Sequence, residues 1–152
     1  METLEKILGE HPFFHDLQER YLQLIVGCTS NVRFDAGHVI FREGEEANTF
    51  YLIRQGKVAL QISSERRGPI TVLTLEEGEI LGWSWLFPAH RYKFTARTLE
   101  PTRAFAIDGH CLRDKAEQDH DLGYDLLMRW APIMERALEA TRLQLVNVYQ
   151  DR

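Results

Sequence analysis

Two absences narrow the class of protein before any motif is considered. The 152-residue chain contains no run of roughly 18 apolar residues, so the sequence predicts no membrane-spanning helix and no membrane partner. A basic excess is also missing, because the formal net charge is -5. Proteins that bind a nucleic-acid backbone usually carry such an excess, so this composition argues against direct nucleic-acid binding.

Cysteine is scarce in this sequence. Cys28 and Cys111 are the only two, they lie far apart, and they form no Cys-x-x-Cys pair. This pattern argues against a four-cysteine zinc site or an iron–sulfur cluster and predicts two ordinary, buried or half-buried thiols in a reducing cytosol. The N-terminus METLEKILGE is amphipathic and acidic, unlike a secretory signal or a transit peptide. We therefore expect a cytoplasmic protein.

Patterns typical of enzymes are missing as well. The sequence has no nucleophile–base pair, no HExxH, no P-loop and no paired carboxylates in a supporting context. His11 and His15 are four residues apart, as metal ligands on one helix would be. Pro12, however, is expected in the first turn of the following helix, which leaves His11 outside it. We interpret both as surface or capping histidines and expect no catalysis and no metal.

What the chain does contain falls into three zones of one domain, residues 1–152. Helical spacing of apolar residues covers about 3–27, short strand-like runs cover about 31–108, and helical spacing returns over about 109–150. Glycines punctuate the middle zone, which predicts an antiparallel barrel or sandwich. Within it, IRQGKV predicts a tight hairpin in which Gly56 has a positive φ. Gly27 is expected to end the first helical zone.

The third zone carries its own start and stop signals. Asp108 is expected to cap a short helix, and Asp119 or Asp121 a longer one. Pro132 lies inside the longer pattern and removes a backbone donor there, so we expect a kink or a break near Trp130.

The segment FDAGHVIFREGEEANTFYLIRQGKVAL, residues 34–60, resembles the cyclic nucleotide-binding domain of Crp/Fnr-type (catabolite activator-like) regulators, of cAMP-dependent kinase regulatory subunits and of nucleotide-gated channels. The residues that carry the resemblance are Phe34, Gly37, Ile40, Gly44, Glu45, Tyr51, Ile53, Gly56 and Val58. The helical ends and ARTLEPTRAFAID also fit, so the resemblance covers nearly the whole chain. It implies a mainly β fold: an antiparallel, jelly-roll-like β-roll with N-terminal helices and a long C-terminal helix.

The family binds its ligand in a phosphate cassette, a short helix between two late strands whose amides face the cyclic phosphate. An arginine neutralises the phosphate and a glutamate accepts from the ribose hydroxyl. Here the corresponding stretch is GWSWLFPAHRYKFTAR. The preferred alignment places Gly82 at the cassette glycine and Trp83 at the glutamate. Tyr92 and Lys93 then fall where the arginine and its neighbour are expected.

An alternative alignment uses Gly78 and Glu79 as the Gly-Glu pair, but it lengthens the cassette and puts Glu79 into a strand. In the preferred alignment the ribose acceptor is missing, because an indole only donates. That loss is worth roughly 1.5–3 kcal/mol. Arg91 could swing in toward the phosphate, and Lys93 could supply a point charge. The resemblance therefore implies the fold more firmly than it implies cAMP or cGMP as the ligand.

The candidate ligand-binding residues are Gly82, Trp83, Ser84, Trp85, Arg91, Tyr92, Lys93 and Thr95. The two tryptophans are either a stacking wall for a flat ligand or a cover over the open end of the roll. Thr141 and Arg142 lie where relatives place contacts from the terminal helix to the base.

The leading hypothesis is a non-enzymatic regulatory or sensory module that binds a small anionic ligand, such as cAMP, cGMP or another nucleotide-like anion. It would signal through its C-terminal helices, act as a homodimer through the last helix, and regulate an unknown protein partner. The alternative is a ligand-free protein–protein interaction module whose cassette is filled by Trp83 and Trp85. DNA binding is not expected, since relatives that bind DNA carry a helix-turn-helix after the long helix and this sequence stops at Arg152.

Overall fold

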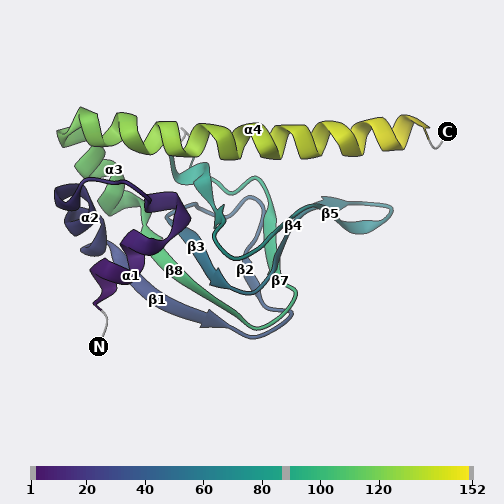
Figure 1. The fold of residues 1–152 in the computed structure, drawn as a ribbon. Coiled ribbons are helices and arrows are strands. Elements are labelled where there is room, and N and C mark those ends of the chain that lie inside the picture. The colour runs from purple at the N-terminus through teal and green to yellow at the C-terminus, as the bar shows by residue number, and fades with distance from the viewer. Residues whose placement is uncertain (1–2, 87–89, 151–152) are drawn as a thin grey trace.

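The middle of the chain folds into two antiparallel sheets that pack on each other, and helices from both ends of the chain gather beside them (Figure 1). The computed structural model describes residues 3–86 and 90–150. The helices are α1 (Leu4–Glu10), η1 (Pro12–Phe14), α2 (Glu19–Val26), η2 (Trp83–Leu86), α3 (Gly109–Gln118) and α4 (His120–Gln150). The strands are β1 (Thr29–Phe34), β2 (Val39–Phe41), β3 (Thr49–Gln55), β4 (Val58–Ser64), β5 (Gly68–Leu75), β6 (Ile80–Leu81), β7 (Thr95–Thr98) and β8 (Thr102–Asp108).

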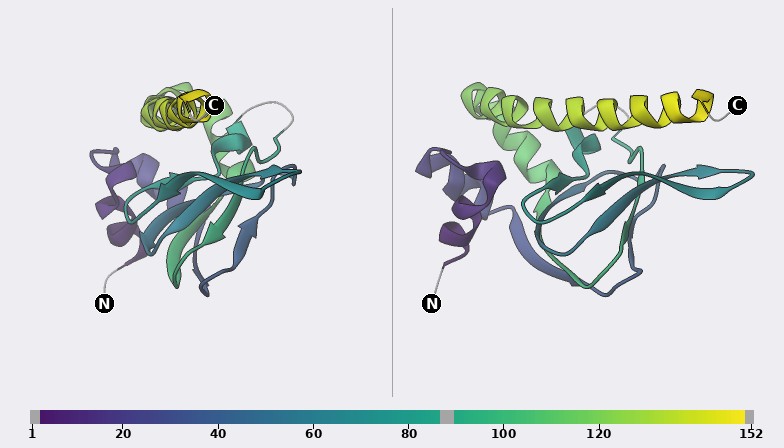
Figure 2. Two further views of the ribbon diagram at one scale, coloured as in Figure 1. Left: turned by 90° about the vertical axis from the view of Figure 1, so that its right-hand side faces the viewer. Right: turned by 45° about the vertical axis from the view of Figure 1, so that its right-hand side comes forward.

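Each sheet is built from strands that are distant in the sequence. The strand orders are β1-β8-β3-β6 and β2-β7-β4-β5. The late strands β8 and β7 thus lie between early ones, which is the rolled arrangement of an antiparallel jelly-roll-like fold. The long helix α4 runs across the top of the roll (Figure 2). The predicted mainly β fold with N-terminal helices and a long C-terminal helix is confirmed.

Strand alternation divides the core into two clusters. In β3, Phe50 and Leu52 face the helices, whereas Ile53 faces the inside of the roll. The cluster between sheet and helices also contains residues of α2, α3 and α4, among them Trp130, which is 0% exposed. The position of α4 is therefore fixed through its first half, where the buried side chains concentrate.

Several local signals in the sequence work as predicted. Gly56 has φ 119° in the turn from β3 to β4, and a Cβ there would collide with Thr102. Gly27 ends α2. Asp108 caps α3 by accepting hydrogen bonds from the amides of His110 and Cys111. Asp119 caps α4 by accepting from the amides of residues 121 and 122.

Of the kink or break expected near Trp130 because of Pro132, the break is wrong. Helix α4 continues through Pro132 over its whole length of 31 residues (Figure 1). The reason lies in packing: Trp130 and Ala137, on either side of the proline, are both buried against the rest of the molecule, so the helix is held in place on both sides of Pro132. Among the described helices, α4 included, none combines the length and the apolar character needed to cross a bilayer.

The interpretation of Cys28 and Cys111 as free thiols is also wrong. The two residues form a disulfide, with their Cα atoms 5.9 Å apart across a sequence separation of 83. Residue spacing did not indicate this bond, because only the fold brings the end of α2 against the first turn of α3. The cysteines therefore no longer support a reducing compartment, and the cytoplasmic location stays a prediction.

Candidate functional site

The turn into η2 depends on Gly82. Its φ is 89°, and a Cβ at this position would meet Thr49 O at 3.2 Å and Phe50 Cα at 3.3 Å. The helix η2 begins at the next residue, which is where the preferred sequence alignment places the phosphate cassette. We call the described residues 82–86 and 90–94 the cassette. It lies on the side of the roll that faces α4 (Figure 1).

The cassette encloses very little space. A cavity of about 10 Å³ is lined by Phe41, Leu60, Gly82, Trp83, Ser84, Tyr92, Lys93 and Phe94. That volume is roughly the minimum for one water molecule, so a nucleotide fits only if a side chain moves. Five of the eight candidate ligand-binding residues line this cavity. The side chain of Trp85, another candidate, lies outside the described part of the structure.

Tyr92 fills the space where the family resemblance implies a phosphate-binding arginine. Its ring stacks on Phe41 with centroids 3.7 Å apart, and its hydroxyl donates to Thr49 O at 2.5 Å. Burial raises the pKa of Tyr92, so its hydroxyl stays neutral. The side chain therefore supports the inside of the roll and offers an anion no positive charge.

Three further polar candidates, Lys93, Arg91 and Thr95, are separated by the structure. Lys93 lines the cassette cavity, is exposed, and has no ion pair or hydrogen bond with another described residue. Arg91 points to another loop and donates to Gly44 O at 2.9 Å. The Thr95 hydroxyl accepts from the Glu43 amide at 3.0 Å. Of the two cationic candidates, Lys93 is thus the one that lines a cavity together with Trp83.

A larger cavity lies on the other side of Trp83, between the roll and α4. Its volume is about 290 Å³. It is lined by Pro12, Phe13, Leu60, Leu73, Leu75, Gly78, Glu79, Ile80, Trp83, Met128, Arg129, Pro132, Ile133, Arg136 and Ala137. The walls are mostly apolar, with a few polar groups at one side, as is usual for small-molecule sites. No signal in the sequence predicted the α4 side of this cavity, because no spacing rule shows which turn of a long helix covers a sheet.

An ion pair crosses this larger cavity from the roll to the helix. Glu79 Oε1 accepts from Arg136 Nη2 at 3.0 Å, while Glu79 Oε2 is buried without a hydrogen-bond partner in the described part of the chain. Glu79 therefore binds the roll to α4 and does not line the cassette cavity. Its backbone oxygen accepts from the Ile53 amide at the start of β6.

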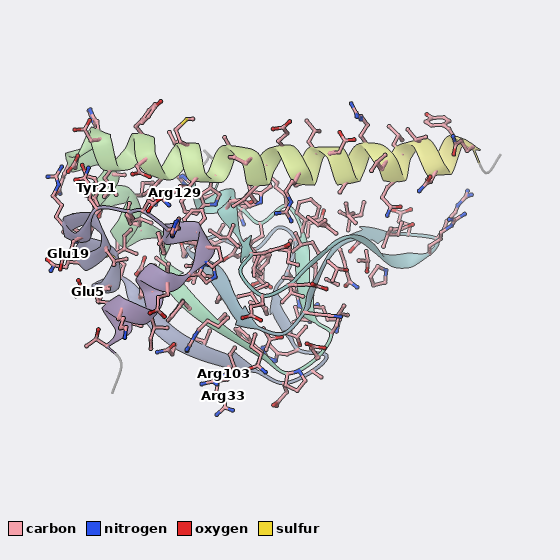
Figure 3. All side chains as sticks on the ribbon, viewed as in Figure 1. Glu5, Glu19, Tyr21, Arg33, Arg103 and Arg129 are labelled. Carbon is pink, nitrogen blue, oxygen red and sulfur yellow. A yellow bond between two sulfur atoms is a disulfide. The ribbon has the colours of Figure 1, made fainter. Side chains whose placement is uncertain are left out.

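The first half of α4 is anchored near this cavity by Arg129. Its guanidinium donates to Phe13 O at 2.7 Å, to His15 O at 2.8 Å and to Asp125 Oδ1 at 2.5 Å (Figure 3). Farther along, the Thr141 hydroxyl donates to Ala137 O at 2.8 Å, and Arg142 pairs with Glu139 of its own helix. Neither Thr141 nor Arg142 lines one of these two cavities.

The described residues hold no group of three or more histidine, cysteine, aspartate or glutamate side chains suited to a metal ion. What the arrangement offers instead is a flat aromatic ring, Trp83, between two cavities, with a lysine on one side and an ion pair on the other.

Comparison with known families finds a match over residues 31–119 to the model described as "Cyclic nucleotide-binding domain". Among curated proteins, human cGMP-dependent protein kinase 2 is 38% identical over 82 residues, which cover 53% of this chain and 11% of that protein. The CRP-like cAMP-activated global transcriptional regulator of Mycobacterium tuberculosis is 22% identical over 147 residues, covering 95% of this chain and 63% of that protein. The chain thus spans about a tenth of the kinase and less than two thirds of the regulator.

Solved structures agree with this match. A candidate cyclic nucleotide-binding protein from Geobacter metallireducens GS-15 has a TM-score of 0.81 at 30% identity, covering 90% of this chain and 99% of that chain. A cyclic nucleotide-binding domain from Methylobacillus flagellatus KT has a TM-score of 0.80 at 15% identity, covering 94% and 84%, and shows the same fold. With its β-roll, the helix after Gly82 and a family match over more than half its length, the chain belongs to the cyclic nucleotide-binding domain family.

Proposed function

We propose that this chain is a non-enzymatic regulatory module that binds a small, flat, anionic ligand beside the cassette and signals through its C-terminal helices. One observation carries the proposal: the side chain of Trp83 borders both the cavity of about 10 Å³ and the cavity of about 290 Å³. A rotation of this ring would join the two. The joined space reaches the lower end of the range of pockets that bury small ligands, about 300–1,000 Å³.

The lining of the two cavities favours a nucleotide-like anion as the ligand. Apolar walls and the indole of Trp83 suit a flat heterocycle, and Lys93 supplies at the cassette end a positive charge that pairs with no described residue. Relatives that are named for cAMP or cGMP support the same class of ligand. Because Trp83 cannot accept from a ribose hydroxyl, we propose that cAMP and cGMP bind more weakly here than in a cassette with a glutamate, by roughly 1.5–3 kcal/mol.

The proposed signal passes through the contact between the larger cavity and α4. Arg136 is held to the roll by Glu79, and both residues line the cavity that the ligand would enter. A ligand that binds one arrangement of α4 more tightly than another shifts the population toward that arrangement. Competition of the ligand for Glu79 or Arg136 would supply this difference in affinity.

We also propose that the signalling state is a homodimer formed through the second half of α4 and that it regulates a protein partner. Large apolar side chains are exposed there, including Leu138 (70%), Leu145 (56%) and Val148 (54%). Their spacing of seven and three residues is that of a coiled-coil seam. Direct DNA binding is not part of this proposal, since the net charge is -5.

Calorimetric titration with a panel of cyclic and linear nucleotides tests the ligand proposal. We expect at least one member to bind with one site per chain, and Lys93→Gln to weaken that binding roughly tenfold or more through loss of a charge-assisted contact. Lys57→Gln is the matched control, because Lys57 is an exposed lysine that pairs with Glu76 and lines neither cavity. Absence of binding across the panel, with no change in tryptophan fluorescence, would instead favour a ligand-free interaction module with an occluded cassette.

A further inference from the structure

The disulfide joins the N-terminal helices to the C-terminal ones at a single point. Cys28 follows the end of α2, and Cys111 is the third residue of α3. Only Asp119 separates α3 from α4, so the bond links α2 to the helix pair that leads into the long helix. Both cysteines pack in the cluster of apolar residues between the sheet and the helices.

A cavity of about 320 Å³ opens beside this bond. It is lined by Gly27, Cys28, Thr29, Ser30, Thr49, Ala106, Asp108 and Cys111. The lining is rich in small and hydroxyl-bearing side chains and includes both cysteines. Cys28 is 8% exposed, whereas Cys111 is half-buried and is the more accessible of the two. A small molecule can therefore approach Cys111 while the protein remains folded.

We propose that Cys28 and Cys111 form a thiol–disulfide exchange site that reacts with low-molecular-weight thiols in the native state. The site lies apart from the cassette, since the cavity beside the disulfide shares no lining residue with the two cavities at Trp83. The exchange reaction requires no nucleotide, and this proposal does not depend on whether the cassette binds a ligand.

The first step consumes one molecule of thiol. Its thiolate attacks Cys111 Sγ and forms a mixed disulfide there, while the electron pair of the broken bond moves to Cys28 Sγ. Cys28 takes up a proton and becomes a thiol. Leu24 O lies 3.8 Å from Cys28 Sγ, in position to accept a weak hydrogen bond from that S–H group.

The second step consumes another molecule of thiol. Its thiolate attacks the small-molecule sulfur of the mixed disulfide, so the two small molecules become joined in a disulfide and Cys111 is released as a thiolate. The protein disulfide has then gained two electrons, and two molecules of thiol have been oxidised to one disulfide. The Cys111 amide already donates to Asp108 Oδ1 at 3.1 Å, so the Cys111 thiolate takes up a proton and ends as a thiol.

Reduction changes how firmly α2 holds the start of α4. Without the disulfide, the polar contacts that remain between them are weak: Tyr21 Oη donates to Asp119 Oδ1 at 3.4 Å, and Arg20 Nη1 lies 3.9 Å from Asp119 Oδ2. Figure 3 shows Tyr21 beneath the start of α4. Apolar packing of α2 against α3 and α4 remains after reduction, so the fold persists while the α2–α3 junction becomes more mobile.

The test treats the oxidised full chain with reduced glutathione under native conditions, followed by alkylation and mass spectrometry. We expect an intermediate that carries one glutathione on Cys111 and one alkyl group on Cys28. In a second arm, oxidised glutathione should modify the Cys28→Ser variant, through Cys111, at least about tenfold faster than it modifies Cys111→Ser, through Cys28. Amide hydrogen exchange should show faster exchange in α2 and α3 after reduction and no change in β4 and β5.

Three outcomes would overturn the proposal: a reaction rate that follows global unfolding across a urea series, glutathione attached first to Cys28, or reduced wild-type protein that fails to re-form the bond with oxidised glutathione. The arms on the wild-type chain keep the test decisive if either serine variant fails to fold. Binding of nucleotides in calorimetry reports on the cassette separately, so failure of one proposal leaves the other intact.

Discussion

At the scale of single residues, His11 shows how one buried polar side chain can hold two segments together. It ends α1 and begins η1, and it is 7% exposed, so the expectation of a capping residue is confirmed while that of a surface residue is wrong for His11. Its Nδ1 accepts from the Phe13 amide at 3.2 Å, and its Nε2 contacts Ile53 O at 3.1 Å. Both contacts are satisfied by the neutral ring with its proton on Nε2.

The free energy of unfolding should fall as the pH drops below about 6.5 because of His11. Burial lowers the pKa of His11 in the folded state, although the Ile53 carbonyl opposes this effect, so the unfolded chain binds the proton first. Stability from this residue is therefore present above the unfolded pKa and is lost as the pH falls toward the folded pKa. The slope is at most about 1.4 kcal/mol per pH unit.

Urea unfolding between pH 7.5 and roughly pH 5 measures this slope. The His11→Asn variant should lose this part of the pH dependence, although it is less stable overall. His15→Asn is the matched control, since the side chain of His15 is 78% exposed. If His11→Asn keeps the slope of the wild-type protein, buried His11 is not its source.

Tyr92 shows what residue-level reasoning missed at the site. Alignment placed Tyr92 at a ligand-binding position, but the ring stacks on Phe41 and the hydroxyl is bonded to the backbone. An aromatic residue at a ligand position can either wall a pocket or fill it, and the sequence carries no measure of the volume that surrounds it.

At the scale of elements, the pair β1 and β8 carries an unusual charge arrangement. Arg33 and Arg103 lie directly opposite each other, and neither has an ion pair or a hydrogen bond with another described residue. Figure 3 shows both side chains extending away from the roll in the same direction. Like charges at directly opposite positions weaken a strand pair.

Replacing either arginine by threonine should therefore raise the free energy of unfolding by about 0.2–1 kcal/mol, since threonine also suits a strand. A double-mutant cycle over Arg33→Thr and Arg103→Thr, measured by urea unfolding, isolates the repulsion between the two charges. The coupling should shrink as salt is raised toward about 1 M. A coupling free energy of zero at low salt would show that the two guanidinium groups do not repel each other.

Element boundaries were predictable where a local rule decides them. The caps at Asp108 and Asp119 and the turn at Gly56 act within a few residues, so the sequence shows them directly. The predicted break at Pro132 was also local, but tertiary packing of α4 on both sides of the proline overrode it. Burial of side chains on both sides of a proline can outweigh the helix-breaking preference of that proline.

At the scale of the whole molecule, α4 consists of an anchored half and an exposed half. Leu122, Leu126 and Trp130 are buried, whereas the side chains from residue 138 onward are largely exposed. An apolar stripe of this kind is stable in water when a second helix covers it. The proposed homodimer supplies such a cover.

Sedimentation velocity should therefore show a dimer that Leu145→Glu dissociates, because a buried unpaired charge in the seam is costly. Leu99→Glu is the matched control: Leu99 is a similarly exposed leucine, at 51% against 56% for Leu145, and it lies on the roll. A wild-type chain that sediments as a monomer, or equal effects of both variants, would contradict the seam on α4.

The sequence by itself determined the order of elements, the helix caps at Asp108 and Asp119 and the turn at Gly56, because each depends on local backbone preferences. The β-roll and the place of the cassette at Gly82 followed from the family resemblance. The tertiary structure alone decided the Cys28–Cys111 bond, the pairing of Glu79 with Arg136 and the cavity beneath α4. Those features join residues that are distant along the chain. Their meeting is fixed by how the helices pack on the roll, which no spacing within the sequence expresses.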